Sequence, residues 1–251
     1  MVLDGCSCVL HRWTPRTEPL RGAAVVLHGL GAHALYPTVK YAAELLCERG
    51  LAVHALDLPG HGESAGLRGL LPSATALEDA GLLVARRAAA AHPEIPLFLL
   101  GSSMGGALAL AVSRRIPRVA GVVLLAPMLM LDVPPWQRIM LRLGACLAPS
   151  LAAIPSSATS PSHQYRDLER RRECTEDELT YKGKLRLGSA STCVELAART
   201  CACTHPLPSR PPITAPLPPP ARAPPPPPPP LSLLSPRPIT AGDPAPAPRP
   251  A

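Results

Sequence analysis

Aromatic residues make up only 3% of this 251-residue sequence, and charged residues make up only 17%. The formal net charge is +7, but the basic residues are dispersed along the chain. The densest basic cluster, Arg170–Arg172, is flanked by Glu169 and Glu173, which is typical of a solvated helix surface. A nucleic-acid-binding face needs clustered Lys and Arg within a recognisable module. We therefore expect no nucleic-acid partner.

Long hydrophobic runs are also lacking. The longest strongly apolar stretch, Val119–Leu131, has 13 residues, whereas a transmembrane helix needs about 20. The first ten residues contain no apolar signal-peptide core and carry an acid at position 4. We therefore expect a cytoplasmic protein, in which cysteines stay reduced.

The eight cysteines do not follow the spacing of a metal site. Cys6 and Cys8 have no second pair of the CxxC type, and neither has the run Cys201-Ala-Cys203-Thr-His205. Structural zinc sites draw their four ligands from two such halves. We therefore expect no metal and no cofactor.

Proline divides the chain into two parts. Of the 35 prolines, 21 lie in residues 206–251, where they exclude helices and central strands. We expect residues 1–203 to form the folded domain and residues 204–251 to be a proline-rich, disordered tail of polyproline II type.

Apolar strands alternate with helices through the first half of the chain. Continuous apolar runs predict buried strands at 23–27, 51–56, 97–100 and 119–125. Helices are expected between them, at 37–49, 73–91 and 104–115. This alternation indicates the α/β class, with a mostly parallel sheet and helices on both faces. Beyond residue 127 prolines interrupt the pattern, although residues 166–181 and 182–200 remain helix-prone.

The strand at 97–100 runs directly into Gly101-Ser102-Ser103-Met104-Gly105, and a helix follows. A G-x-S-x-G motif between a buried strand and a helix predicts a nucleophile elbow, with Ser103 as the catalytic nucleophile. The backbone N–H of Met104 would then point at an oxyanion. The alternative is that Ser103 is a small residue that only closes a tight turn.

A second oxyanion-hole donor is expected after the first long strand, where His28-Gly29-Leu30-Gly31 follows. The backbone N–H of Leu30 is the candidate. His28 could be interpreted as a catalytic base, but it precedes the serine, whereas the hydrolase order is serine, acid, histidine. We therefore expect a hydrogen-bonded structural role for His28.

Together these segments resemble the monoacylglycerol lipase-like branch of the α/β-hydrolase superfamily, the lysophospholipase-like or serine aminopeptidase S33 group. The resemblance covers roughly residues 4–200 and implies an α/β-hydrolase fold with a helical cap at about 128–185. It also implies a serine ester hydrolase acting on a lipid ester such as monoacylglycerol or lysophospholipid. The residues that carry it are DGCSCVLHRWTP at 4–15, VVLHGLGAH at 25–33, ALDLPGHGES at 55–64, LLGSSMGG at 99–106, VVLLAPMLML at 122–131 and ELTYKGKLR at 178–186.

The resemblance leaves two interpretations of the cap open. Caps of this family form an apolar acyl tunnel and can lie on membrane surfaces, and the apolar stretch Ile139–Ile154 would suit peripheral membrane contact. The plainer interpretation is that the cap only covers the pocket. The sequence leaves the oligomeric state open.

The acid and the base of a catalytic triad have no family-type counterpart here, so both are unknown. After Ser103 the only histidines are His163, inside the expected cap, and His205, at the start of the tail. The aspartates after Ser103 follow no late strand of the family type; they are Asp132, Asp167, Asp177 and Asp243. We expect a chain truncated at the C-terminus, without the late strands and weakly active or inactive. The strand at 119–125 would then be an open sheet edge that promotes aggregation.

A different class of function also fits the tail. Its seven consecutive prolines could bind SH3, WW or profilin-type partners, which would make the chain a non-enzymatic adaptor or pseudoenzyme.

Overall fold

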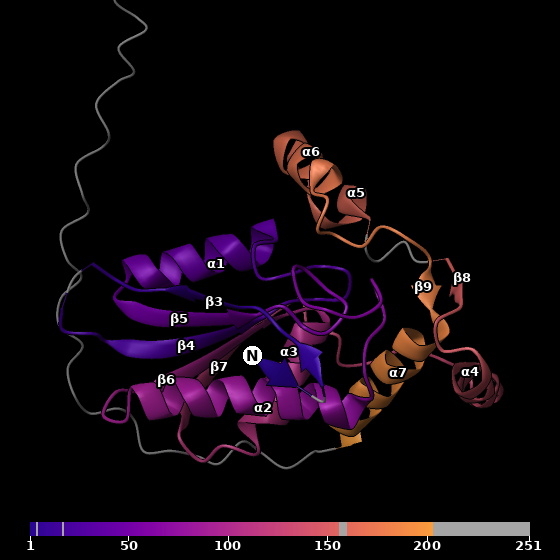
Figure 1. The fold of residues 1–251 in the computed structure, drawn as a ribbon, viewed down its shortest axis with the longest axis horizontal. Helices are drawn as coiled ribbons and strands as arrows, with labels where there is room; N and C mark the ends of the chain where they lie inside the picture. The colour runs from indigo at the N-terminus through magenta and orange to yellow at the C-terminus, as the bar shows by residue number, and fades with distance from the viewer. Residues whose placement is uncertain (4, 17, 156–159, 203–251) are drawn as a thin grey trace, which may run out of the picture. The chain divides into compact units, whose positions relative to one another are not determined.

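The computed structural model describes residues 1–3, 5–16, 18–155 and 160–202 (Figure 1). The expected proline-rich tail at 204–251 lies outside these residues, so its disorder and its adaptor role stay predictions. The expected boundary of the folded domain near residue 203 stays a prediction as well.

The main sheet has five strands in the order β3-β5-β4-β6-β7. Neighbouring strands run parallel, except that β3 is antiparallel to β5. The expected mostly parallel α/β sheet is therefore confirmed. The strands are β3 (Leu10–Trp13), β4 (Gly22–Leu27), β5 (Leu51–Leu56), β6 (Leu97–Ser102) and β7 (Val119–Leu125). A separate two-stranded ribbon pairs β1 (Val2–Leu3) with β2 (Cys6–Ser7).

Helices cover both faces of this sheet, with α1 (Pro37–Glu48) and α2 (Ala74–Ala91) on opposite faces (Figure 1). The side chains of β4 show why. Ala24 and Val26 pack in one apolar cluster with residues of α1. Ala23, Val25 and Leu27 pack in another with α2 and with α3 (Met104–Ser113). Because successive side chains of a strand point to opposite faces, a continuous apolar run fills two cores.

Local signals set the bounds of the helices. The Ser73 hydroxyl accepts a hydrogen bond of 3.2 Å from the backbone N–H of Ala76 and so caps the start of α2, as the sequence predicts. Pro37 opens α1, where a missing N–H costs nothing. Gly50 ends the turn after α1 with a φ of 86°.

The segment expected to be the cap follows β7. It contains α4 (Pro135–Leu147), β8 (Ala152–Ile154), α5 (Pro161–Gln164), α6 (Leu168–Glu176) and β9 (Leu185–Arg186). The strands β8 and β9 pair antiparallel, so the two ends of the segment between them lie side by side. That segment contains α5 and α6. The chain then continues into α7 (Leu187–Ala202), which packs against α3 and α2. Leu196 of α7 is completely buried in the core between them.

The strand β7 is an edge of the sheet, because within the described residues it pairs only with β6. Its Val123 side chain is 47% exposed, whereas Val25 in the sheet interior is fully buried. The expected open edge is therefore confirmed for the described part of the chain. Among the described helices none has both the length and the apolar character that crossing a membrane requires.

Candidate active site

Ser103 occupies the turn between β6 and α3 in a strained backbone conformation, with φ 52° and ψ −117°. Non-glycine residues rarely adopt a positive φ, and they keep it only where the surroundings impose it. Here the backbone N–H of Ser103 donates to the Leu125 carbonyl at 2.9 Å. The Ser103 carbonyl accepts from the N–H groups of Gly106 and Met128, each at 2.9 Å. The turn is therefore held by α3 and by the end of β7.

Two glycines of the motif are required by close backbone contacts. A Cβ atom on Gly105 would lie 2.1 Å from the carbonyl oxygen of Leu27. A Cβ atom on Gly101 would lie 2.1 Å from the carbonyl oxygen of Gly105. Both distances are far inside van der Waals contact, so no other residue fits without displacing the backbone. The glycines let α3 pack directly onto the end of β4.

The loop after β4 lies against the serine. Leu27 is in register with Gly101, which brings the carboxyl ends of β4 and β6 together. A Cβ atom on Gly29 would be 3.2 Å from the Cβ atom of Ser103 and 3.8 Å from its Oγ atom. Leu30, the next residue, is half-buried. The residue expected to give the second oxyanion donor therefore follows a direct neighbour of Ser103.

Met104 is the first residue of α3 and is fully buried. Its backbone N–H has no acceptor within the helix, because the first four N–H groups of a helix lack one. The helix N-terminus also carries partial positive charge. These features suit an oxyanion hole, while the roles of Leu30 and Met104 stay predictions.

His28 is fully buried and makes a hydrogen bond at each ring nitrogen. Its Nδ1 lies 2.8 Å from the Gly29 carbonyl, and its Nε2 accepts from the Leu58 N–H at 3.0 Å. Burial, followed by the neighbouring His61, lowers the pKa of His28 to about 3. His28 is therefore a neutral structural residue that ties the loop after β4 to the loop after β5, as expected from the order of the motifs.

The sequence interpretation missed a structural carboxylate, Asp57, directly after β5. It is 1% exposed and accepts hydrogen bonds from the N–H groups of Ala34 at 2.7 Å and Glu63 at 2.9 Å, with His11 Nε2 at 3.1 Å. Burial favours the neutral acid, but these hydrogen bonds outweigh it and lower the pKa of Asp57. The sequence signal that could have identified Asp57 is its position directly after the buried strand β5.

His11, Asp57 and Glu63 place possible metal-ligand atoms within 4.8 Å of one another. Both carboxylate oxygens of Asp57 already accept from backbone N–H groups, however, and His11 bonds the same carboxylate. This cluster is therefore a hydrogen-bonded loop anchor.

No acid or histidine in the described part of the chain forms a hydrogen bond with the Ser103 hydroxyl. Asp167 caps α6 by accepting from the N–H groups of Glu169 and Arg170. His163 lies on the short helix α5 and is exposed. Asp132 is also exposed. His205 and Asp243, the other residues that the sequence offers, lie outside the described residues.

Asp177 has a different partner, because its carboxylate lies 2.6 Å from Nε2 of the buried His33. Burial raises the pKa of Asp177, but the hydrogen bonds from His33 and Thr180 outweigh it and hold the pKa below its usual value. Nearby, the N–H of Tyr181 donates to the Gly31 carbonyl at 2.8 Å. The segment after α6 is thus bonded directly to the loop that carries Leu30.

An apolar cavity of about 470 Å³ lies among α4, β8, β9 and α7. Apolar cavities of this volume are typical of small-molecule sites. The side chains that line it include Leu131, Trp136, Met140, Ile154, Leu185 and Val194.

Comparison with known proteins agrees with this architecture. A family model described as serine aminopeptidase, S33, matches residues 18–207. The monoacylglycerol lipase of Mycolicibacterium smegmatis is 34% identical over 213 residues, which are 82% of this chain and 74% of that protein. The monoglyceride lipase of Rattus norvegicus is 32% identical over 129 residues, which are 51% of this chain but only 41% of the rat protein.

Solved structures share the fold. The monoacylglycerol lipase of Paleococcus ferrophilus superposes with a TM-score of 0.63 at 24% identity, over 77% of this chain and 71% of that one. A soluble variant of the monoglyceride lipase of Saccharomyces cerevisiae gives a TM-score of 0.65 at 18% identity, over 79% of this chain and 67% of that one. With a family model that spans most of the chain, this protein belongs to the serine aminopeptidase S33 family and is a monoacylglycerol lipase-like α/β-hydrolase.

Proposed function

We propose that this chain binds a lipid ester of the monoacylglycerol or lysophospholipid class at Ser103 and hydrolyses it weakly or not at all. The observation that carries the proposal is the strained Ser103 turn, packed against Gly29 but without a hydrogen-bonded base in the described residues. A substrate carbonyl beside Ser103 would meet the N–H groups of Leu30 and Met104, which are the proposed oxyanion donors.

The expected rate of hydrolysis follows from a site that has a serine and proposed oxyanion donors but no base bonded to the serine among the described residues. A neutral serine hydroxyl is a weak nucleophile until a base takes its proton. In a serine protease, loss of the nucleophile or base costs about 10⁶-fold in kcat, or roughly 8 kcal/mol. About 10³- to 10⁴-fold over water survives there from the oxyanion hole and substrate binding. We therefore infer a residual rate that does not depend on Ser103.

The substrate class is supported by the names of the relatives and by the apolar cavity beside α4. Peripheral membrane contact is supported by α4 itself, which has no buried residue. Its Trp136, Ile139, Leu143 and Leu147 side chains are between 52% and 86% exposed. An amphipathic helix with large apolar side chains on one face is typical of membrane-surface binding. We propose that α4 is the membrane-contacting element.

Hydrolysis of p-nitrophenyl esters by the wild-type chain and by Ser103→Ala tests the proposal. Both should hydrolyse the ester far more slowly than an ordinary enzyme does, and the two rates should be equal within error. Ser102→Ala, one residue away, controls for changes in the turn itself. Turnover at ordinary enzyme rates, abolished by Ser103→Ala and retained by Ser102→Ala, would contradict the proposal. It would mean that a histidine reaches Ser103, and His205 would be the first to replace.

A further inference from the structure

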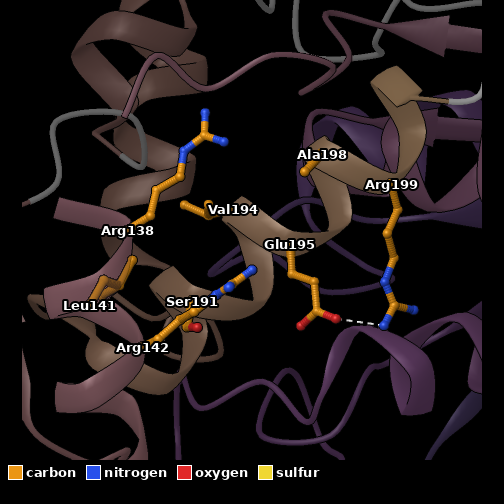
Figure 2. A pocket seen from close by; sticks show the side chains of 8 residues that line it. All are labelled: Arg138, Leu141, Arg142, Ser191, Val194, Glu195, Ala198 and Arg199. Carbon is orange, nitrogen blue, oxygen red and sulfur yellow. Dashed lines mark hydrogen bonds and ion pairs between the residues drawn. The ribbon is translucent and has the colours of Figure 1, made fainter. Parts of the chain in front are cut away.

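A second pocket, of about 360 Å³, lies between α4 and α7 (Figure 2). Arg138, Leu141 and Arg142 line it from α4, and Val194, Glu195 and Arg199 line it from α7. It shares Leu141 and Val194 with the apolar cavity, so the two lie side by side along the same pair of helices. This pocket is far more polar than the apolar cavity. The proposed hydrolase chemistry makes no use of it.

The charges around this pocket are unbalanced. Glu195 pairs with Arg199 at 2.5 Å, and Figure 2 shows its carboxylate directed toward that arginine. Arg138 donates its Nε–H to the Val133 carbonyl at 2.8 Å, which leaves its terminal N–H groups for other partners. Arg142 has no ion-pair or hydrogen-bond partner within the described residues. The pocket therefore offers two guanidinium groups to an anion.

Arg138 and Arg142 are four residues apart on α4, so they project from the same side of the helix. A planar guanidinium group matches the oxygens of a phosphate, so two of them on one side of a helix can bind it through several charge-assisted hydrogen bonds. No residue of α4 is acidic, so nothing on this helix opposes an anion.

The arginines also border the exposed apolar side chains of α4. Ile139, 60% exposed, lies three residues before Arg142, which makes the two neighbours on the helix surface. Arginines beside large apolar side chains suit the boundary between lipid head groups and acyl chains, where the charged end stays in the polar layer. A free phosphate would need the arginines but not the adjoining apolar surface.

We propose that the pocket between α4 and α7 binds the phosphate of an anionic phospholipid through Arg138 and Arg142, while the exposed apolar side chains of α4 contact the acyl chains. The assignment rests on the proposed membrane contact of α4. It adds a head-group site to that contact, and with it a preference for anionic over neutral bilayers.

Sedimentation with vesicles tests the site. One set contains phosphatidylcholine alone, and the other contains phosphatidylcholine mixed with phosphatidylglycerol. The double variant Arg138→Gln/Arg142→Gln should bind the anionic vesicles about tenfold or more weakly than the wild type, because each basic residue near an anionic surface contributes about 1 kcal/mol. Its binding to neutral vesicles should not change.

The matched control is Arg86→Gln/Arg87→Gln, which removes the same charge from two adjacent exposed residues of α2. It should keep its affinity for anionic vesicles within about twofold, since long-range attraction is screened by salt beyond a Debye length. Equal losses in the two double variants would show that net charge alone attracts the protein, and would overturn the site. Circular dichroism melting checks that both variants are folded.

Other outcomes separate this proposal from the membrane contact on which it rests. Equal binding of the wild type to neutral and anionic vesicles would overturn the head-group site and leave the membrane contact of α4 standing. No binding to either vesicle would overturn both. If inorganic phosphate stabilised the wild type but not Arg138→Gln/Arg142→Gln, and vesicles did not bind, the pocket would be a soluble-phosphate site. Ester hydrolysis, measured without vesicles, reports on the proposed hydrolase separately.

Discussion

At the scale of single residues, Ser103 keeps a positive φ because Gly101 and Gly105, two residues away on either side, leave room for the tight turn, and because its own N–H and carbonyl are both hydrogen-bonded. Such a strained position costs about 1–3 kcal/mol, and the surrounding structure must offset it. The turn could be predicted from the sequence because the G-x-S-x-G spacing puts glycines at the two positions where backbones come into close contact. The strand and helix around the motif made the prediction specific.

Gly105→Ala should destabilise the fold by about 2–4 kcal/mol, because a Cβ atom there would meet the Leu27 carbonyl oxygen at 2.1 Å. Urea denaturation measures the change. Gly144→Ala on α4 is the matched control, because the nearest atom to its Cβ would be the end of the Leu187 side chain at 3.1 Å. That side chain can move, and alanine favours a helix by about 0.5–1 kcal/mol over glycine. Equal losses of stability in both variants would contradict the argument.

The buried histidines make stability depend on pH. Burial is the main cause that lowers the pKa of His28 to about 3 and the pKa values of His54 and His61 to about 4. In the unfolded chain these groups titrate near 6.5. Between these values the unfolded state binds more protons than the folded state, so the free energy of unfolding falls as the pH is lowered. Above about pH 6.5 the three histidines are neutral in both states and cost no stability. As the pH falls from 6.5 toward 4, protonation of the unfolded chain progressively lowers the free energy of unfolding.

His54 is the histidine best suited to test this dependence, because it is 7% exposed and forms no hydrogen bond through its ring among the described residues. In His54→Leu, the loss of unfolding free energy between pH 7 and pH 4.5 should be smaller than in the wild type by about 1–2 kcal/mol. Urea denaturation at the two pH values measures it. The same loss in both proteins would mean that His54 is not the titrating group.

At the scale of elements, the strands β4 to β7 and the helices α1 to α3 follow from apolar runs and their caps, within two residues at most ends. The ribbon of β8 and β9 does not, because strands of three and two residues carry no periodicity. The role of Asp57 was also hidden. A polar residue after a strand can be an anchor or a catalyst, and only the folded contacts distinguish the two.

The edge strand β7 should govern aggregation. Its outer side has no partner strand in the described structure, and Val123 is 47% exposed. Natural sheets protect such edges with charged side chains, lysine above all. Val123→Lys should therefore slow aggregation at high concentration, as light scattering measures it, and should change the free energy of unfolding by no more than about 0.5 kcal/mol.

Val2→Lys is the control for that change, since Val2 is 68% exposed on β1, outside the main sheet. It introduces the same charge and should leave the aggregation rate of the wild type unaltered. If both variants slowed aggregation equally, net charge would be the cause rather than the edge of β7.

At the scale of the described domain, the segment after β7 is tied to the loop that follows β4. His33 and Asp177 are 144 residues apart in sequence, and their ring nitrogen and carboxylate oxygen are 2.6 Å apart. In the same region the Tyr36 hydroxyl donates a hydrogen bond of 2.5 Å to Oε1 of Gln164. No spacing rule could pair residues so distant in the chain. The sequence predicted a cap but not where it attaches.

The bond between His33 and Asp177 gives the last prediction. The loop that holds Gly29 beside Ser103 continues through Leu30 into His33, so a loss of the Asp177 carboxylate should loosen that loop. Asp177→Ala should speed amide hydrogen exchange in residues 29–36 and lower the free energy of unfolding by about 1–2 kcal/mol. Glu176→Ala is the control, because Glu176 pairs with Arg172 on the exposed surface of α6. An exposed pair of this kind contributes little to stability because solvent screens it, and its removal should leave exchange in residues 29–36 unchanged. Faster exchange there in both variants would show that α6 as a whole, rather than the Asp177 carboxylate, restrains the loop beside the nucleophile.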